Sequence, residues 1–131
     1  MLMSPQVAPR YGVKVMPPIT LELEKNTSSN GTTTIYHVKG KLSLETVNGF
    51  VQQLRPDESP TLVLDLSGVS FLDSAGVGSL VSLFVSRRNQ GRVLALAALG
   101  PQAKAVVMVA GLHNMLPIYA TVEDAAAGKK S

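Results

Sequence analysis

The first regular pattern along the chain is a strict alternation of apolar and polar side chains. It occupies residues 19–24 and returns at residues 33–39, with a cluster of Asn, Ser and Gly between the two segments. Alternation with a period of two is typical of strands that have one buried face, and two such strands joined by a short turn form a hairpin. We therefore predict an antiparallel hairpin at the start of the folded region.

The remainder of the folded region switches between helical and strand-like patterns. Apolar residues at helical spacing predict helices over 44–54, 75–90, about 101–110 and 122–127, and apolar runs predict strands at 62–66, 92–97 and 116–118. Residues 67–74 are predicted to form a connecting loop. This order of elements indicates an α/β fold: a mixed sheet of four to five strands, the later ones parallel, with about four helices mainly on one face.

Several residues stand where helix ends are expected. Ser43, Ser74 and Thr121 occupy N-cap positions before the predicted helices. Arg87 and Arg88 fall in the last turn of helix 75–90, where positive charge complements the helix dipole.

The length of 131 residues suits a single domain, and 45% of the residues are apolar. We assign residues 1–18, which contain four prolines, to a flexible N-terminal arm, residues 19–127 to the domain and residues 128–131 to a charged tail. Cysteine is absent, which excludes disulfides and thiolate metal sites. The sequence shows no signal peptide and no apolar stretch long enough to span a bilayer, so we expect a cytoplasmic protein without membrane contact.

The net charge of +3 is only mildly basic. The one internal cluster of basic residues consists of Arg87, Arg88 and Arg92. A nucleic-acid surface normally needs a denser basic stripe with interleaved aromatic residues, so we predict no direct contact with nucleic acid.

The segment most informative about function is residues 71–78, between the central strand and the helix that follows it. Ligands and partners usually meet open α/β sheets at this end of a strand. Ser74 has two interpretations here: an N-cap that only stabilises the helix, or a modification site, since a helix N-terminus favours anions. A phosphate would add about −1.5 to −2 charges next to Asp73. Phe71, Leu72 and Val77 are predicted to form an apolar patch around it.

Catalysis by Ser74 is poorly supported. A nucleophile elbow requires G-x-S-x-G, and Leu72 replaces the first glycine. The available bases are His37 in a predicted strand and His113 in a predicted loop, and no motif pairs either histidine with Ser74. We therefore predict that the chain is not an enzyme.

Metal and nucleotide sites are not indicated either. Asp65 and Asp73 lack a third ligand at motif spacing. The glycines at 76 and 78 lack the lysine and the spacing of a phosphate-binding loop. We predict no metal and no cofactor.

Residues 62–80, LVLDLSGVSFLDSAGVGSL, strongly resemble the STAS domain of anti-sigma factor antagonists. The resemblance begins at residues 40–42, continues through 91–94 and 110–112, and covers residues 19–127. It implies that Ser74 is phosphorylated by a serine kinase that is also the anti-sigma factor and binds the ATP itself. It also implies that the unphosphorylated chain binds this kinase, which then releases its sigma factor for transcription, and that phosphorylation reverses the binding. The partner-binding residues so implied are Leu42, Ser43, Asp73, Ser74, Ala75 and Gly76.

Two positions depart from the family pattern. Ser43 stands where many members have aspartate, and Ala75 stands where a second serine is common. Alanine at that position also occurs in related STAS proteins that are subunits of other assemblies. An alternative hypothesis is therefore a structural STAS subunit of a lipid transport or stress-signalling complex.

Overall fold

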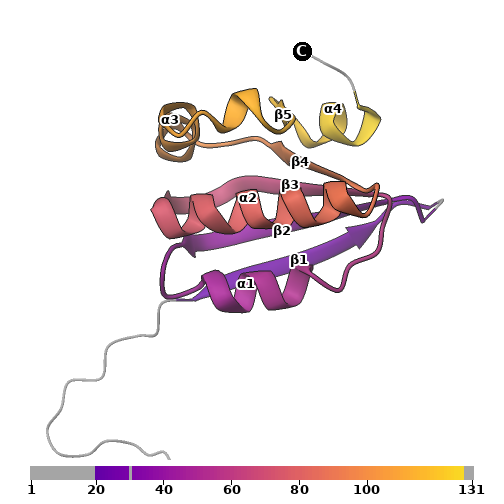
Figure 1. Ribbon diagram of the computed structural model, residues 1–131, viewed down its shortest axis with the longest axis horizontal. Helices are drawn as coiled ribbons and strands as arrows, with labels where there is room; N and C mark the ends of the chain where they lie inside the picture. The colour runs from indigo at the N-terminus through magenta and orange to yellow at the C-terminus, as the bar shows by residue number, and fades with distance from the viewer. Residues whose placement is uncertain (1–19, 30, 129–131) are drawn as a thin grey trace, which may run out of the picture.

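The sheet and the helices follow the predicted order (Figure 1). The computed structural model describes residues 20–29 and 31–128, so the predicted arm 1–18 and the last three residues of the predicted tail lie outside the described residues. The elements are β1 (Leu21–Thr27), β2 (Thr33–Leu42), α1 (Val47–Leu54), β3 (Thr61–Leu72), α2 (Ser74–Asn89), β4 (Val93–Ala97), α3 (Pro101–Val109), the short 3₁₀ helix η1 (Leu112–Asn114), β5 (Ile118–Tyr119) and α4 (Val122–Ala127). In the described part of the chain, no helix has the length and apolar character needed to cross a membrane.

The five strands lie in the spatial order β1-β2-β3-β4-β5. β1 pairs with β2 in antiparallel orientation, and the pairs β2–β3, β3–β4 and β4–β5 are parallel. The predicted mixed sheet is therefore confirmed. Parallel strands bring their carboxyl ends to the same edge of the sheet, so the turns that follow β3, β4 and β5 are neighbours.

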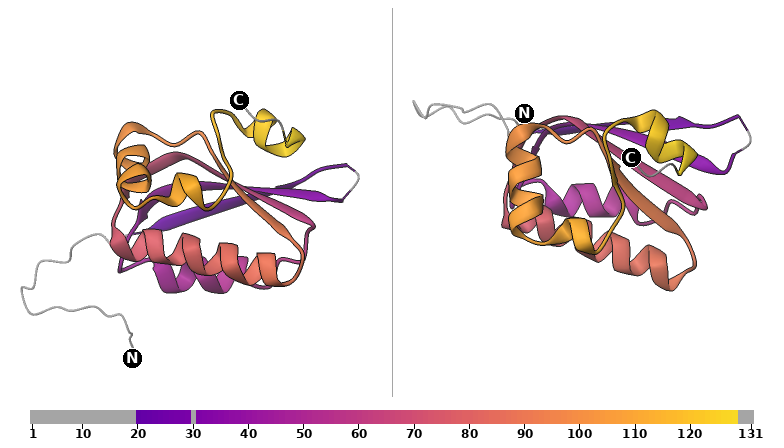
Figure 2. Two further views of the ribbon diagram at one scale, coloured as in Figure 1. Left: turned by 45° about the horizontal axis from the view of Figure 1, so that its top comes forward. Right: turned by 90° about the horizontal axis from the view of Figure 1, so that it is seen from above.

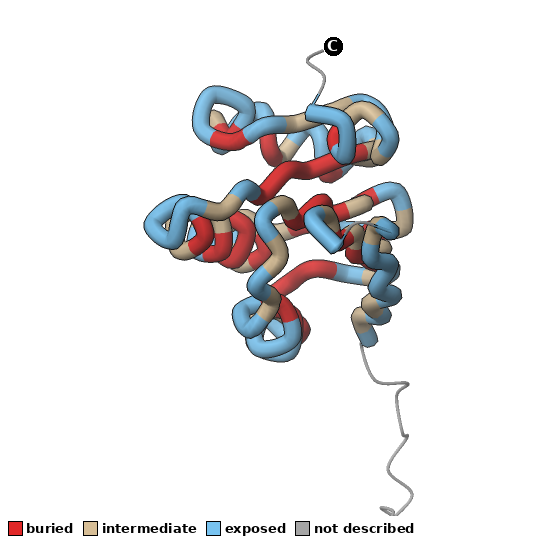
Figure 3. The backbone as a smooth tube through the Cα atoms, turned by 90° about the vertical axis from the view of Figure 1, so that its right-hand side faces the viewer, coloured by how far each residue is buried: buried red, intermediate tan, exposed pale blue. Residues whose placement is uncertain are grey.

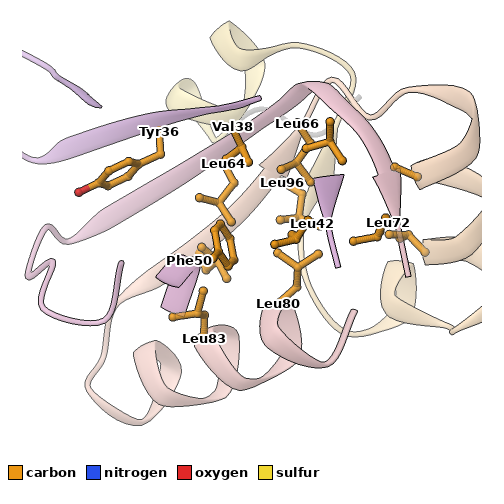
Figure 4. Close-up of a cluster of buried hydrophobic side chains, with 14 of the residues drawn as sticks. Tyr36, Val38, Leu42, Phe50, Leu64, Leu66, Leu72, Leu80, Leu83 and Leu96 are labelled. Atoms are coloured by element: carbon orange, nitrogen blue, oxygen red, sulfur yellow. The ribbon is translucent and has the colours of Figure 1, made fainter. Parts of the chain in front are cut away.

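The main core lies between the sheet and the helices α1, α2 and α3. Its largest side chains come from alternate positions of β2, β3 and β4 and from the inner faces of the helices (Figure 4). Figure 3 shows the same division along the backbone, with buried segments on the strands and exposed segments on the outer turns. Leucine and valine build this core in place of the scarce aromatic residues.

A smaller apolar cluster lies on the opposite face of the sheet, between the strands and α4. Figure 2 shows α4 on the other side of the sheet from α1 and α2. The cluster is centred on Val63, Ala95, Ala97 and Ala125. The small side chains let the single short helix α4 approach the strands closely. The prediction that the helices lie mainly on one face is therefore confirmed, with α4 as the exception.

The third strand is much longer than predicted, and residues 67–72 are strand rather than loop. β3 continues to Leu72 because its pairing with β2 extends to Leu42, through two register shifts. At one of them the backbones approach so closely that a Cβ on Gly68 would lie 2.8 Å from the Val38 carbonyl oxygen. Glycine at 68, which resembles a loop signal in the sequence, is thus required by the strand pairing.

The first helix begins three residues later than predicted, at Val47, and Ser43 is not its N-cap. Residues 43–46 form a turn in which Thr46 Oγ1 accepts a hydrogen bond from the Ser43 N–H (3.0 Å) and donates one to the Lys41 carbonyl (2.7 Å). The Ser43 hydroxyl is bonded to Glu45 instead of a helix N–H. The side chain of Thr46 therefore holds the end of β2 against the start of α1.

Arg87 lies in the last turn of α2, as predicted, but its side chain is buried, with 4% of the residue exposed. Its guanidinium donates hydrogen bonds to the carbonyl oxygens of Asp57, Ser59 and Val93, which belong to segments before β3 and in β4. Burial lowers the pKa of Arg87, and the nearby carboxylate of Asp57 opposes this effect. The side chain thus ties the end of α2 to two other segments of the fold.

Candidate functional site

Ser74 lies at the carboxyl edge of the sheet, where β3 passes directly into α2. It is the first helical residue and not the N-cap. The predicted capping role belongs to Asp73, whose Oδ1 accepts a hydrogen bond from the Gly76 N–H at 2.8 Å. The Ser74 side chain is exposed and forms no hydrogen bond with any described residue. Its hydroxyl is therefore available for chemistry from outside the domain.

Asp73 also joins the start of α2 to the turn after β2. Its second oxygen, Oδ2, accepts a hydrogen bond from the Leu44 N–H at 3.1 Å. One carboxylate thus accepts hydrogen bonds from the N–H groups of two segments. The side chain of Leu44 is held at the surface beside the site.

The glycine at position 76 is required by close packing between α2 and the end of β2. A Cβ on Gly76 would overlap the carbonyl oxygen of Leu42 and the side chain of Leu72. Any larger residue would push the start of α2, including Ser74, away from the sheet.

The six residues implied as partner contacts do not all reach the surface. Leu42, Ser43 and Gly76 are buried, so these residues are not accessible to a partner in this conformation. Asp73 and Ala75 are partly exposed, and Ser74 is exposed. The buried residues form the base on which the exposed ones are positioned.

The predicted apolar patch is also composed differently. Leu72 is 1% exposed and belongs to the core, whereas Val77 is only partly buried and packs against the core. Val77 and Ser74 line a groove of about 350 Å³ between α2 and α3, and the other lining residues are Ala105, Val106, Val109 and Ala110. Val109 is 91% exposed. We call these six residues the Ser74 groove.

Sequence reasoning missed the contribution of α3 to this groove. The signal was present, because residues 105–110, AVVMVA, form an uninterrupted apolar run. A helix that is apolar all round in a small domain cannot bury every face against one sheet. Its outer face is therefore left as an exposed apolar surface.

A second missed residue, Gln102, fixes α3 in place beside Ser74. Its side-chain amide pairs with the backbone of Leu72: Oε1 accepts from the Leu72 N–H, and Nε2 donates to the Leu72 carbonyl, both at 2.9 Å. This bidentate contact attaches one wall of the Ser74 groove to the last residue of β3. Both α2, which follows β3 directly, and α3, which is bonded to it through Gln102, are therefore held by the end of β3.

Neither histidine lies within hydrogen-bonding distance of Ser74. His37 Nδ1 is 2.6 Å from Asp65 Oδ2, on strands β2 and β3. Asn26 donates to the other ring nitrogen, which leaves Nδ1–H to donate to Asp65. His113 belongs to η1 and lines a different part of the surface. Among the described residues, Ser74 therefore has no base of the kind that activates a nucleophilic serine.

The pair formed by Asp65 and His37 predicts a pH dependence of stability. Burial favours the neutral form of Asp65, but hydrogen bonds from Ser67 and His37 outweigh it and lower the pKa of this carboxyl. A depressed pKa contributes stability that is present above the unfolded value, about 3.9, and is lost as pH falls through the folded value.

We therefore expect Asp65→Asn to lower the free energy of unfolding by about 1 kcal/mol at neutral pH and by less at pH 3. Urea denaturation at several pH values measures this difference. Glu58→Gln, which alters an exposed carboxyl, is the control. A deficit in Asp65→Asn that is the same at pH 3 and pH 7 would contradict this account.

Comparison with known proteins places this geometry in a family. The family model of the STAS domain matches residues 24–125, which include strands β2 to β5, most of β1 and the Ser74 site. The chain belongs to the STAS domain family. Structures of similar fold include an anti-sigma factor antagonist from Mycobacterium paratuberculosis, with a TM-score of 0.76 and 23% identity over 89% of this chain and 100% of that one.

Two further structures share the fold of this STAS domain. One is the anti-sigma factor antagonist SpoIIAA in its unphosphorylated form, with a TM-score of 0.67 and 19% identity over 84% of this chain and all of that one. The other is a sulfate transporter family protein from Wolinella succinogenes, with a TM-score of 0.68 and 17% identity over 79% of this chain and 88% of that one. The fold thus occurs both in antagonists and in transporter-family proteins, and the function must be argued from the site.

Proposed function

We propose that this STAS domain is an anti-sigma factor antagonist that binds its partner through the surface around Ser74 and is released when Ser74 is phosphorylated. One observation carries the proposal. An exposed serine with an unengaged hydroxyl stands on the rim of an apolar groove. A kinase can reach this hydroxyl, and a partner that covers the groove must also cover it.

The electrostatics of the site explain how a phosphate would act. The carboxylate of Asp73 already occupies the N–H groups of Gly76 and Leu44. A phosphate on Ser74 would therefore add a second negative group beside the first, next to side chains such as Val77 that offer no compensating charge. Docking would then bury an unpaired dianion, which costs several kcal/mol.

The partner that this mechanism requires is a serine kinase that acts as the anti-sigma factor and binds ATP itself. The STAS domain contributes the acceptor serine and the docking surface, and neither catalysis nor a cofactor is assigned to it. Control of the sigma factor follows because the kinase cannot hold both proteins when they compete for it. The domain then regulates transcription without contacting DNA.

The similarity to a sulfate transporter family protein favours a second candidate, a STAS subunit of a transport assembly. In that case the Ser74 groove would be covered permanently by another subunit, and Ser74 would not be modified. Genes encoded next to this chain distinguish the candidates: a kinase-type anti-sigma factor supports the first, and transporter subunits support the second.

The groove itself can be tested with a single substitution. We expect Val109→Asp to weaken binding of the neighbouring kinase-type anti-sigma factor by about tenfold or more, because a carboxylate would be buried in an apolar contact. Titration calorimetry with the purified proteins gives the dissociation constants. Val93→Asp is the matched control, since Val93 is also exposed but lies at the amino end of β4. Equal binding by both variants would exclude the groove as the docking surface.

A further inference from the structure

A second hollow lies on the other side of α3 from the Ser74 groove. The α3 residues that line it are Lys104, Val107 and Met108, which point about half a turn away from those that line the Ser74 groove. Its volume is about 410 Å³, and its remaining lining residues are Leu99, His113, Ile118, Tyr119 and Ala120. An adjoining hollow of about 460 Å³, formed by residues 113–119, shares His113, Ile118 and Tyr119 with it.

The position of this hollow in the fold is one at which ligands bind. Leu99 follows β4 and Ala120 follows β5, so the hollow lies at the carboxyl ends of two parallel strands. Such positions are common ligand sites in open α/β sheets. Ala98 leaves β4 with a φ of +59°, a left-handed conformation that is uncommon for a residue other than glycine. The N–H of Ala98 donates a hydrogen bond to the carbonyl oxygen of Tyr119, and this bond joins the ends of β4 and β5 beside the hollow.

The lining combines an apolar floor with positive charge. Leu99, Val107 and Ile118 belong to the main core or pack against it, and they form the apolar part of the floor. Lys104 and His113 supply nitrogen donors, and Tyr119 supplies a hydroxyl. None of the residues that line either hollow is acidic. The charge of the lining is thus complementary to an anion, and its floor is complementary to an alkyl chain.

We propose that this hollow binds a small amphiphilic anion: a carboxylate carried on a short aliphatic chain. The chain would cover Leu99 and Ile118, which are partly exposed, and remove their exposed surface from water. The carboxylate would lie toward the ammonium group of Lys104, which forms charge-assisted hydrogen bonds with such groups, and toward the ring N–H of His113. Ser74 does not line this hollow, so the proposed site is independent of the role proposed for Ser74.

The test is an NMR titration of the full chain, followed on the backbone amides, with sodium octanoate as the probe. Acetate, which lacks the chain, and octylammonium, which has the opposite charge, are the ligand controls. We expect octanoate to shift the amides of Leu99, Lys104 and Ile118 with a dissociation constant of about 1 mM or tighter. Acetate and octylammonium should bind at least about tenfold more weakly.

Substitutions of the basic residues distinguish specific binding in the hollow from nonspecific adsorption of octanoate to the protein surface. Lys104→Gln and His113→Gln should each weaken octanoate binding about fivefold or more, whereas Lys39→Gln, which removes an exposed charge on β2, should not. The Ser74 groove is an internal control, because it is apolar but has no charged lining residue. Three results would each overturn the proposal: equal shifts with octylammonium, shifts confined to Val77 and Val109, or no binding up to about 5 mM octanoate.

Discussion

Replacing Ser74 with glutamate is expected to weaken binding of the anti-sigma factor by about a hundredfold or more. This factor corresponds to about 3 kcal/mol, which is within the cost of burying an unpaired charge at an interface. The new carboxylate would stand on the rim of the Ser74 groove beside Asp73, which cannot neutralise it. Calorimetric titration of the variant against the kinase-type anti-sigma factor measures the loss.

The control for this prediction is Ser74→Ala, which should bind about as tightly as the parent chain. The hydroxyl of Ser74 forms no hydrogen bond with a described residue, so its removal should leave the fold intact. Ser70→Glu, which introduces the same charge at an exposed position earlier in β3, tests whether charge alone is responsible. If Ser74→Glu retained parental affinity, the assignment of the switch to Ser74 would be wrong.

Removal of the Arg87 guanidinium is expected to cause the largest loss of stability. Arg87→Met keeps an unbranched apolar side chain in place of the arginine stem but leaves three carbonyl oxygens without their donor. Each buried polar group that loses its partner costs about 1–3 kcal/mol, so we expect a loss of about 3 kcal/mol or more. Urea denaturation followed by circular dichroism provides the measurement.

The adjacent arginine is a matched control for that substitution. Arg88 is exposed and lies over the ring of Phe84, with 5.6 Å between the guanidinium carbon and the ring centroid. An exposed cation–π contact contributes about 0.5–1 kcal/mol, so Arg88→Met should cost no more than that. Equal losses from the two substitutions would show that Arg87 does not have the structural role assigned to it.

The order of elements could be predicted from the sequence because it depends on local periodicity. The alternation of apolar and polar residues identifies the strands of the hairpin, and the helical spacing of apolar residues after residue 74 identifies a helix; each pattern depends only on residues within that element. The position of Ser74 at the start of a helix followed from the same signals. What these signals cannot decide is which of two adjacent residues caps the helix. Asp73 and Ser74 are both good N-caps, and Asp73 takes this role because its second oxygen also binds the Leu44 N–H.

The parts of the site that could not be predicted depend on contacts between distant segments. Gly68 and its neighbours resemble a loop, but pairing with β2 extends the strand through them. Gln102 looks like an ordinary surface residue of α3, yet it holds Leu72 thirty residues away. Arg87 and Arg88 are indistinguishable in sequence, and only the segments that surround each of them make one buried and the other exposed.

The most direct test of the central claim is to locate the phosphate and to measure its effect on binding in the same preparation. The purified STAS domain is incubated with the kinase-type anti-sigma factor and ATP, mapped by mass spectrometry, and titrated against fresh kinase before and after the reaction. We expect a phosphate on Ser74, none in the Ser74→Ala variant, and a loss of affinity of about a hundredfold on modification. A phosphate on Ser67 or Ser79 instead, or unchanged affinity after modification of Ser74, would contradict this claim.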